Sequence, residues 1–420
     1  MTKKIGIIGL GYVGLPLAIE FAKKYDVVGF DINSTRIDEL RKNRDRTNEI
    51  SAEELETTTI KFTPHTLSLH DCNIYIVTVP TPIDNNKQPD LSPLISASEI
   101  IGKVLREGDL VIYESTVYPS CTEEICIPIL TDKSGYGIEY DYFVGYSPER
   151  INPGDKINTL TTIKKVVSGN NEEATKMVDD LYQSIGITTH IAPNIQVAEM
   201  SKAIENAQRD LNISFMNELA IYCNLLGIKT DDVLKAAGTK WNFLPFTAGL
   251  VGGHCISVDP YYLIHKAESM GLHLNVIASG RRVNDQMPKF IVSNLIKKMI
   301  RKHCDVNNPR ILVMGITFKE DVPDLRNSKV IEVVKELETY NATVDVYDPH
   351  ADRDLLWNEY KISSNKKMYD LPNIKYDAII YAVNHEDFKD FPFPVFSDKD
   401  KTVIYDLKNK LPEEIVDITL

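Results

Sequence analysis

The fold is decided by the stretch KKIGIIGLGYVGLPLAIEFAKKYDVVGFDIN (Lys3–Asn33). The apolar run Ile5–Ile8 ends at a glycine, as a strand buried on both faces does, and residues 15–24 follow with helical periodicity. A second apolar run, Val27–Phe30, ends at Asp31. The pattern predicts a complete strand–helix–strand unit, the start of an α/β domain with an open parallel sheet and helices on both faces.

Three glycines in this unit, Gly9, Gly11 and Gly14, have the spacing of the dinucleotide-binding fingerprint. The first permits a tight turn, the second lets the backbone approach a pyrophosphate, and the third lets helix and strand pack closely. The following helix would present its N–H groups to the phosphates. Asp31 is placed to bind the ribose hydroxyls, which favours NAD over NADP, although Arg36 leaves NADP open. A glycine turn without a ligand is the alternative.

Composition and charge limit the class of protein. The chain has 420 residues, 43% of them hydrophobic and 25% charged, which is typical of a globular protein with two or three domains. Its formal net charge of −13 argues against a nucleic-acid or anionic-membrane surface. We find no apolar run of about 18 residues and no signal peptide, and the six cysteines are scattered without zinc spacing. We therefore expect reduced thiols, no metal, no membrane insertion and a cytoplasmic location.

The pattern of the chain changes after residue 193. Residues 194–227 contain no proline and predict one long helix of about 45 Å. Strand and helix patterns alternate again near the C-terminus. We predict two Rossmann-like doubly wound domains joined by helices, with these boundaries: an NAD-binding domain at 1–193, a central helical domain at 194–304 and a C-terminal α/β domain at 305–420. The long helix suggests a homodimer or a higher homo-oligomer.

Two loops are expected at the ligand-binding edge of the first sheet. VPTPID (Val79–Asp84) and ESTV (Glu114–Val117) each follow a predicted strand. In a doubly wound sheet, ligands bind at the carboxyl ends of the strands. Thr81, Ser115 and Thr116 are therefore candidates for hydrogen bonds to a cofactor or a water molecule, with ordinary loop residues as the alternative.

Lys202, Asn206 and Arg209 are spaced to share one face of the long helix. A solvated charged face is the usual explanation for such a set. Against it, small residues suited to close packing accompany them, namely Ala198, Ala203 and Ala207. A lysine in this place could lie in a pocket.

The segment GLVGGHCISVDPYY (Gly249–Tyr262) contains the candidate nucleophile, Cys255. The two glycines before it would let the backbone approach a ligand closely, and Asp259 lies about one turn beyond it. His254 could be a base, a specificity residue or a buried core residue. The alternative for Cys255 is an inert buried thiol.

In the C-terminal domain, FKEDVPDLRNS (Phe318–Ser328) concentrates charge in the loop after a predicted strand. Lys319 and Arg326 are anion-binding candidates there, and a solvated acidic loop is the alternative.

Together these segments resemble the UDP-glucose/GDP-mannose dehydrogenase family of NAD-dependent nucleotide-sugar 6-dehydrogenases. The resemblance spans nearly the whole chain and rests on seven motifs in order: GLGYVGLPLA, VPTP, ESTV, SPER, AEMSKAIENAQRD, GGHCISVDP and FKEDVPDLRNS. GGHC followed by VDPYYL, and GTKWNFLPF before it, are similar to the branch that acts on N-acetylated sugars in surface-polysaccharide synthesis. The resemblance therefore implies UDP-N-acetylglucosamine as substrate, with the N-acetylgalactosamine, N-acetylmannosamine and glucose counterparts as alternatives.

The resemblance also implies residue roles. Cys255 would be the nucleophile, and Lys202 and Asp259 would flank the oxyanion and the catalytic water. Asn206 would hold the substrate, and Thr116 and Glu149 would lie near the water and the sugar. The implied NAD-binding residues are Gly9, Gly11, Tyr12, Val13, Gly14, Asp31, Arg36, Pro80, Thr81, Ser115, Thr116 and Arg326. The implied UDP-sugar-binding residues, partly in the C-terminal domain, are Glu149, Arg150, Lys202, Asn206, Arg209, Gly252, His254, Arg281, Phe318 and Lys319.

Two positions depart from the family pattern. Pro153 stands where glucose-specific members carry a second glutamate, which implies that a single glutamate activates the water. Thr247 stands where a basic residue is expected, so the diphosphate would lack a cation unless Arg281 or Arg282 supplies one. A four-electron oxidation through a Cys255 thiohemiacetal and thioester follows from the resemblance. A two-electron hydroxy-acid dehydrogenase and a non-catalytic nucleotide-sugar sensor are the competing classes.

Overall fold

The computed structural model divides the chain into two compact units. It describes residues 2–84, 86–138, 141–151, 160–253 and 256–420. The first unit comprises 1–206 and 261–274, and the second comprises 207–260 and 275–420. The predicted cysteine and histidine of the GGHC motif, Cys255 and His254, lie outside the described residues, as does Pro153. The three domain boundaries given above stay a prediction.

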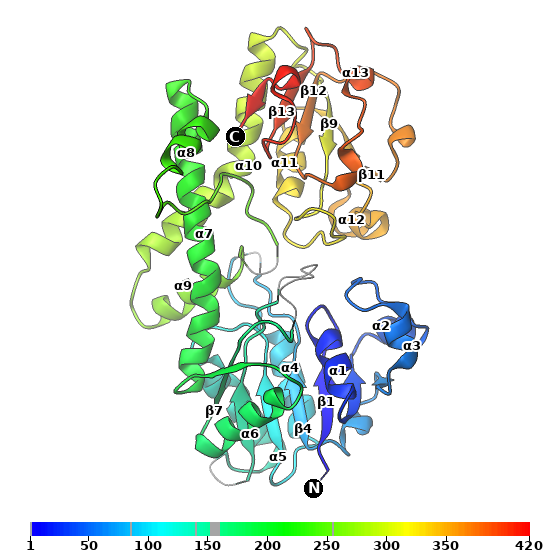
Figure 1. The fold of residues 1–420 in the computed structure, drawn as a ribbon, viewed down its shortest axis with the longest axis vertical. Helices are drawn as coiled ribbons and strands as arrows, with labels where there is room; N and C mark the ends of the chain where they lie inside the picture. The colour runs from blue at the N-terminus through cyan, green and yellow to red at the C-terminus, as the bar shows by residue number, and fades with distance from the viewer. Residues whose placement is uncertain (1, 85, 139–140, 152–159, 254–255) are drawn as a thin grey trace. The chain divides into compact units, whose positions relative to one another are not determined.

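The first unit contains an eight-stranded sheet with helices packed around it (Figure 1). The strand order is β3-β2-β1-β4-β5-β6-β7-β8. Its strands are β1 (Lys4–Ile8), β2 (Asp26–Phe30), β3 (Lys61–Thr63), β4 (Ile74–Val77), β5 (Leu110–Tyr113), β6 (Phe143–Tyr146), β7 (Lys165–Gly169) and β8 (Thr189–Ile191). Its helices include α1 (Gly14–Ala22), α2 (Ser34–Arg41), α3 (Ala52–Thr57), α4 (Ser92–Gly102), α5 (Ile127–Ser134) and α6 (Glu172–Gln183).

One strand pair departs from the all-parallel sheet expected from the sequence. β7 pairs with β6 in the antiparallel direction, while the other pairs of this sheet are parallel. β7, α6 and β8 together extend the sheet beyond β6, and the sequence reading had not assigned them. An antiparallel edge on an otherwise parallel sheet is common in doubly wound folds.

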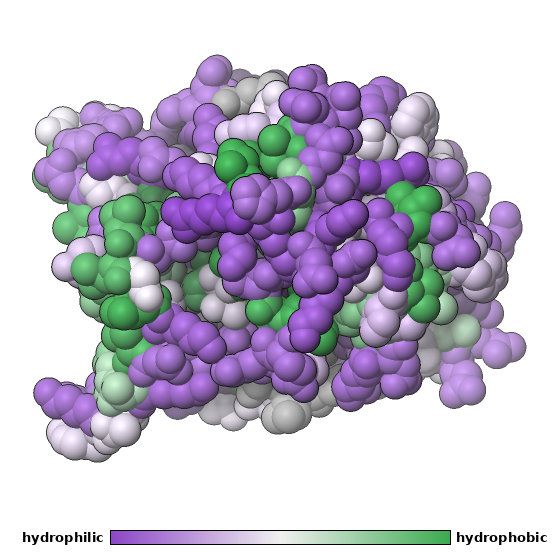
Figure 2. Space-filling view, turned by 90° about the horizontal axis from the view of Figure 1, so that it is seen from above, coloured by the Kyte–Doolittle hydropathy of each residue, from purple (hydrophilic) through white to green (hydrophobic). Residues whose placement is uncertain are grey.

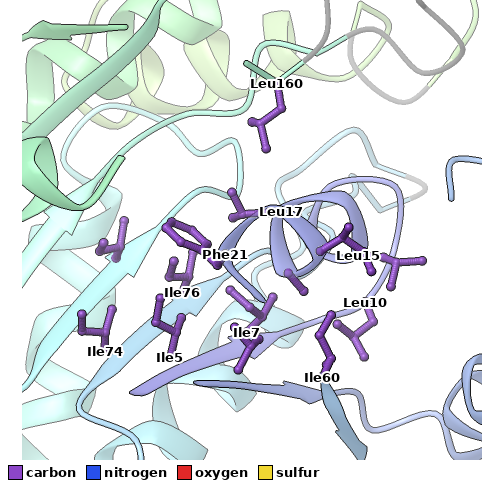
Figure 3. Packing of buried hydrophobic residues seen from close by; sticks show 14 of the residues in the cluster. Ile5, Ile7, Leu10, Leu15, Leu17, Phe21, Ile60, Ile74, Ile76 and Leu160 are labelled. Atoms are coloured by element: carbon purple, nitrogen blue, oxygen red, sulfur yellow. The ribbon is translucent and has the colours of Figure 1, made fainter. Parts of the chain in front are cut away.

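The continuous apolar strands of this sheet are explained by burial on both faces. Ile5, Ile7, Leu17 and Phe21 are all fully buried, and α1 packs on β1 through them (Figure 3). Burying a side chain of this size contributes about 1.5–3 kcal/mol, so a polar residue in this run would be strongly destabilising. The packing places the glycine loop, which joins β1 to α1, at the carboxyl edge of the sheet.

Helical segments follow the first sheet. The predicted long helix is confirmed as α7 (Ile195–Leu226), 32 residues in one run (Figure 1). It is followed by α8 (Thr230–Ala237), α9 (Asp259–Ser269) and α10 (Asn275–Arg301). No helix in the described ranges is both long enough and apolar enough to cross a membrane.

The second unit contains a six-stranded parallel sheet of order β11-β10-β9-β12-β13-β14. On β9, Ile311 and Val313 belong to one apolar cluster, and Leu312 and Met314 belong to the cluster on the opposite face. The unit therefore has a doubly wound sheet of its own, as the sequence predicts. Its strands are β9 (Arg310–Met314), β10 (Thr343–Tyr347), β11 (Ser364–Asn365), β12 (Ala378–Tyr381), β13 (Val403–Asp406) and β14 (Ile418–Thr419), with helices α11 (Lys329–Glu338), α12 (Arg353–Tyr360) and α13 (Phe393–Phe396).

The surface agrees with the acidic, charged composition. Hydrophilic residues cover most of the face shown in Figure 2, and hydrophobic residues gather there in separate patches.

Candidate functional site

The glycine loop after β1 has the geometry that the dinucleotide fingerprint requires. Gly9 adopts φ +95°, and a Cβ there would meet the backbone of Thr78 and Val79 at 3.2 Å. A Cβ at Gly14 would lie 1.9 Å from the Gly9 carbonyl oxygen, so α1 packs directly on the loop. At Gly11, which is exposed, a Cβ would meet nothing within 4 Å. The loop is closed on its inner side and open at Gly11, where a pyrophosphate needs to approach.

Asp31 lies at the end of β2, beside this loop. Its carboxylate accepts hydrogen bonds from the N–H groups of Leu10 and Asn33, each at 2.9 Å. No side chain caps the N-terminus of α1, so no capping side chain competes there with a phosphate. Tyr12 and Val13 complete the turn and are half-buried. These features fit a dinucleotide with its pyrophosphate on α1 and its ribose near Asp31.

Arg36 has a structural setting that the sequence did not suggest. Its Nε donates to the Leu10 carbonyl at 2.8 Å, and its guanidinium lies 2.8 Å from the buried carboxylate of Asp45. Burial raises the pKa of the Asp45 carboxyl, but hydrogen bonds from Thr47 and Ile50 outweigh this effect. The pKa is therefore lowered, and Asp45 stays an anion. Arg36 is only 5% exposed and supports the glycine loop from within. This setting argues against its expected role as a direct NAD ligand.

The two polar loops at the edge of the first sheet are bonded to each other. Ser115 Oγ donates to the Val79 carbonyl at 2.7 Å, and Thr81 Oγ1 donates to the Thr116 carbonyl at 2.6 Å. Tyr262 adds a third bond, from its hydroxyl to the Thr81 carbonyl at 2.9 Å. The Ser115 and Thr81 protons therefore hold the loops in place, and these hydroxyls meet a ligand as acceptors.

Glu149 follows β6 and lies in a buried group of charges. Its Oε1 accepts the N–H groups of Arg150 and Ile151, each at 2.5 Å, and its Oε2 lies 3.7 Å from the Lys165 ammonium. Lys165 is 2% exposed and forms a 2.9 Å ion pair with Glu114. Burial raises the pKa of Glu114. At Lys165 burial acts in the opposite direction, but the two carboxylates outweigh it and raise the pKa of the ammonium.

The predicted face of α7 is only partly confirmed. Lys202 and Asn206 are 8% and 6% exposed, as residues of a pocket should be. Arg209, one turn further along the helix, is exposed. Arg150, the neighbouring cation, turns to Glu205 of the same helix at 2.8 Å.

Gly252 and Gly253, the glycines before the candidate nucleophile, were expected to let the backbone approach a ligand, but in the structure they contact another loop of the protein. A Cβ at Gly252 would lie 2.7 Å from the Asn327 carbonyl oxygen, and Gly253 adopts φ +87° with the Phe318 ring 2.9 Å from its Cβ position. Gly253 N–H also donates to Asn327 at 3.3 Å. The glycines therefore let this segment approach the loop after β9, rather than leaving room for a ligand at those two positions. Asp259 begins α9 and is 2% exposed.

Arg281 was expected to compensate for the missing cation at Thr247, and the structure contradicts this. Its guanidinium pairs with Asp210 at 2.5 Å and with Asp285 at 2.6 Å, and the residue is 1% exposed. Burial raises the pKa of Asp210, and Arg281 offsets that shift. A buried arginine bonded to two carboxylates is committed to the protein interior. Arg282, the other candidate, is exposed.

The loop after β9 holds the remaining predicted residues. Phe318 lies against Gly253, as described, and Lys319 beside it is half-buried. Arg326 forms a forked ion pair with Asp324, with Nη2 and Oδ2 2.6 Å apart. The pair orders the loop locally.

One cluster could hold a metal ion by composition. Asp321, His350 and His385 offer ligand atoms within 4.8 Å of one another. Both ring nitrogens of His385 have partners already: Nδ1 accepts the Asp321 N–H at 3.0 Å, and Nε2 lies 3.2 Å from Asp348. An ion would have to displace a backbone hydrogen bond, so the cluster is better explained as a structural network.

Sequence reasoning missed several residues that organise these sites. Lys165 and Tyr262 are fully or nearly fully buried and hold Glu149 and Thr81 respectively. Asn217 on α7 exchanges two hydrogen bonds with Gly249, at 2.8 and 2.9 Å, and so fixes the start of the glycine segment. Tyr262 belongs to the quoted VDPYY motif, which was a usable signal. For Lys165 and Asn217 the single sequence offers none.

Comparison with family models covers most of the chain. The model described as UDP-glucose/GDP-mannose dehydrogenase family, NAD binding domain, matches residues 3–186. The central-domain model of the same family matches 196–286, and its UDP binding domain model matches 312–413.

Individual relatives are similar over the full length. A UDP-N-acetyl-D-glucosamine 6-dehydrogenase from Pseudomonas aeruginosa is 54% identical over 99% of both chains. One from Salmonella typhi is 52% identical over 99% of this chain and 98% of the relative. Among solved structures, a UDP-D-ManNAc dehydrogenase from Pyrococcus horikoshii has a TM-score of 0.87 at 30% identity, covering 99% of this chain and 97% of the other.

Proposed function

The chain belongs to the UDP-glucose/GDP-mannose dehydrogenase family, and we propose that it oxidises the C6 alcohol of a UDP-N-acetylhexosamine to a carboxylate with NAD as the oxidant. The observation that carries the proposal is the full-length similarity to two UDP-N-acetyl-D-glucosamine 6-dehydrogenases. It supports UDP-N-acetylglucosamine as the preferred sugar.

NAD, when bound, accepts a hydride from C6 in each of two successive steps. The chain's own contribution is to bind and orient it. Gly11 leaves the backbone open to the pyrophosphate, the N-terminus of α1 faces the phosphates, and Asp31 offers a carboxylate to the ribose. A 2′-phosphate would meet that carboxylate, which supports NAD over NADP.

In the proposed chemistry, Cys255 captures the aldehyde left by the first oxidation as a thiohemiacetal. Loss of the second hydride gives a thioester, and Lys202 stabilises the oxyanion at each stage. Glu149 takes a proton from water, the water oxygen bonds to C6, and the C6–S bond breaks to return the thiolate. Thr116 and Asp259 are proposed to orient the water, and Asn206 to hold the sugar.

The substrate and the stoichiometry are tested together. Purified protein with UDP-N-acetylglucosamine should yield two NADH per sugar and a uronic acid. The ratio kcat/KM should fall about tenfold to two-hundredfold for UDP-glucose, because a pocket built for an acetamido group leaves unpaired polar atoms around a bare hydroxyl. A preference for UDP-glucose would contradict the substrate, and one NADH per sugar would contradict the mechanism. A preference for the N-acetylmannosamine or N-acetylgalactosamine sugar would change the epimer only.

A homo-oligomer assembled through α7 is also proposed. The helix exposes large apolar side chains, among them Phe215 (53%), Tyr222 (57%) and Leu225 (80%). Such side chains are commonly covered by a partner. Light scattering coupled to size exclusion should give at least twice the 47.5 kDa chain mass.

A further inference from the structure

A buried ion pair lies directly behind Glu149 in the first unit. Lys165, the first residue of β7, places its ammonium 2.9 Å from Glu114 Oε2 and 3.4 Å from the Pro148 carbonyl. The other carboxylate oxygen of Glu114 accepts a short hydrogen bond from the Tyr182 hydroxyl. Glu114, Lys165 and Tyr182 are each at most 2% exposed, so the pair is shielded from solvent.

Glu149 competes with Glu114 for this single ammonium. Its Oε1 is held by two backbone N–H groups, whereas its Oε2 is buried and has no hydrogen-bond partner within the described part of the chain. That oxygen lies 3.7 Å from Lys165, at ion-pair distance but beyond a hydrogen bond. A buried carboxylate oxygen without a donor is costly unless a nearby charge or a bound water compensates it. The geometry leaves one Glu149 oxygen available to a water molecule.

We propose that Lys165 and Glu114 are positioning residues for Glu149. Lys165 stabilises the Glu149 carboxylate as an anion, and Glu114 limits how much of that charge Glu149 receives. The inference rests on the proposed function, in which Glu149 accepts the proton of the hydrolytic water.

The consequence concerns thioester hydrolysis alone. In that step the water proton passes to Glu149, the water oxygen bonds to C6, and the electron pair of the C6–S bond returns to sulfur. Only an ionised carboxylate can accept that proton, so the pH profile of uronic-acid release should respond to the charges next to Glu149. In the described ranges, the charged groups next to Glu149 are Glu114 and Lys165, with Tyr182 behind them, while Arg150 is turned to Glu205.

Opposite shifts are therefore expected from two variants. In Lys165→Met the carboxylate loses its cation, so the acidic limb of the release rate should move up by about one pH unit or more. The rate at neutral pH should fall about tenfold to a hundredfold, with KM for the UDP-sugar nearly unchanged. In Glu114→Gln the charge of the Lys165 ammonium is no longer shared with Glu114, so the acidic limb of the release rate should move to lower pH. Lys165→Arg should restore most of the rate.

The measurement is a single turnover with enzyme in excess over UDP-N-acetylglucosamine, following NADH by absorbance and uronic acid by chemical quench. Lys165→Met should release two NADH at the normal rate and then accumulate acyl-enzyme. Lys302→Met is the matched control, because Lys302 forms a 2.9 Å ion pair with Asp417 in the second unit. Its limb should coincide with that of the wild type.

The possible outcomes distinguish a failure of this inference from a failure of the proposed function. If both variants keep the wild-type limb, or shift it in the same direction, the inference is overturned while the proposed function stands. If the wild type forms no uronic acid, the proposed function itself is overturned. Should Lys165→Met fail to fold, Glu114→Gln and the double variant Glu114→Gln/Lys165→Met take its place. The double variant removes the whole pair, and its limb must then lie above that of Glu114→Gln.

Discussion

The two doubly wound sheets end their first strands alike and then diverge. In the first, Gly9 follows β1 with φ +95° and donates to Phe30 at 2.9 Å; in the second, Gly315 follows β9 with φ +84° and donates to Tyr347 at 2.8 Å. An aspartate ends the next strand in each case and accepts the N–H of the residue after the glycine. The shared features therefore belong to the turn directly after the first strand of each sheet, whether a helix follows at once, as α1 does, or after a longer loop, as α11 does.

The difference lies one residue further on. Gly11 is exposed with open space above it, whereas Thr317 at the equivalent place is fully buried and lies 3.2 Å from His385. Asp348, the counterpart of Asp31, is itself fully buried and accepts four backbone N–H groups. The first sheet keeps its turn open for a pyrophosphate, and the second fills the same place with its own side chains. The same sheet architecture therefore offers a dinucleotide-binding loop only where the protein's own side chains leave the turn open.

The largest expected effect separates chemistry from cofactor binding. Cys255→Ala should abolish uronic-acid formation, a loss of about four orders of magnitude or more, because it removes the proposed nucleophile. NAD affinity, which depends on the first sheet, should stay within about twofold of wild type. Cys304→Ala is the control, since that half-buried thiol donates to the Lys401 carbonyl and packs against the apolar cluster of the second sheet. Near-normal NADH production from Cys255→Ala would refute the covalent mechanism.

The glycine loop after β1 is tested at Gly11. Gly11→Ala places a methyl group in space that the protein leaves empty, so folding stability should hardly change. The same methyl group would obstruct the pyrophosphate, so kcat/KM for NAD should fall about a hundredfold, or about 2.8 kcal/mol. Thr317→Ala should show the reverse, a loss of stability with normal use of NAD. If Gly11→Ala binds NAD normally, the pyrophosphate does not lie against Gly11, and the open turn of the first sheet is not its binding site.

The second sheet should depend on pH through Asp348. Burial raises the pKa of the Asp348 carboxyl, but hydrogen bonds from the His385 side chain and from the backbone N–H groups of Ile316 and Thr317 outweigh it and lower the pKa to about 2, from its usual 3.8. Because the folded value is the lower one, the carboxylate contributes about 2 kcal/mol above pH 4, and this is lost as pH falls from 4 toward 2. Asp348→Asn should therefore destabilise the protein at pH 7, by thermal unfolding, and the gap to wild type should narrow below pH 4. Asp370→Asn, at a half-exposed ion pair with Arg353, should change little at any pH.

The smallest expected effect is cofactor choice. NAD should be preferred over NADP by about tenfold or more in kcat/KM, roughly 1.4 kcal/mol, because the proposed ribose site includes the Asp31 carboxylate, which would repel a 2′-phosphate. Asp31→Ser should reduce the preference, and Asp348→Asn should leave it unchanged. Equal use of both cofactors by the wild type would remove Asp31 from the ribose site.

Much of the fold could be read from local patterns. The apolar run at Ile5–Ile8, the proline-free stretch that forms α7 and the glycine spacing are each recorded in a few consecutive residues. The extension from β7 to β8 was missed because β7 (KVVSG) has only two adjacent apolar residues and β8 has three residues and is largely exposed, so neither strand has a clear apolar pattern. The direction of β7 depends on its pairing with β6 across the sheet, which is a long-range contact.

The candidate site divides in the same way. Gly9, Gly11 and Gly14 are identified by spacing: backbone geometry requires glycine at Gly9 and Gly14, and a pyrophosphate close to the backbone would require it at Gly11. The roles of the cationic residues could not be identified in this way, because the sequence does not show whether a lysine or arginine faces a ligand or a carboxylate inside the protein. Arg36 and Arg281 were expected to bind ligands and are instead paired inside the protein.

What the sequence by itself determined was the presence of two doubly wound sheets, the glycine turn around Gly11 and the family, because these depend on residue type at short spacing. Only the tertiary structure decided which charges remain for chemistry. Lys165 is brought to Glu149 and Glu114 from a strand that pairs across the sheet, and Arg281 is buried against Asp210 on another helix. Electrostatic partnership acts over a few ångströms of space, whatever the separation along the chain, so it appears only once the strands and helices are packed.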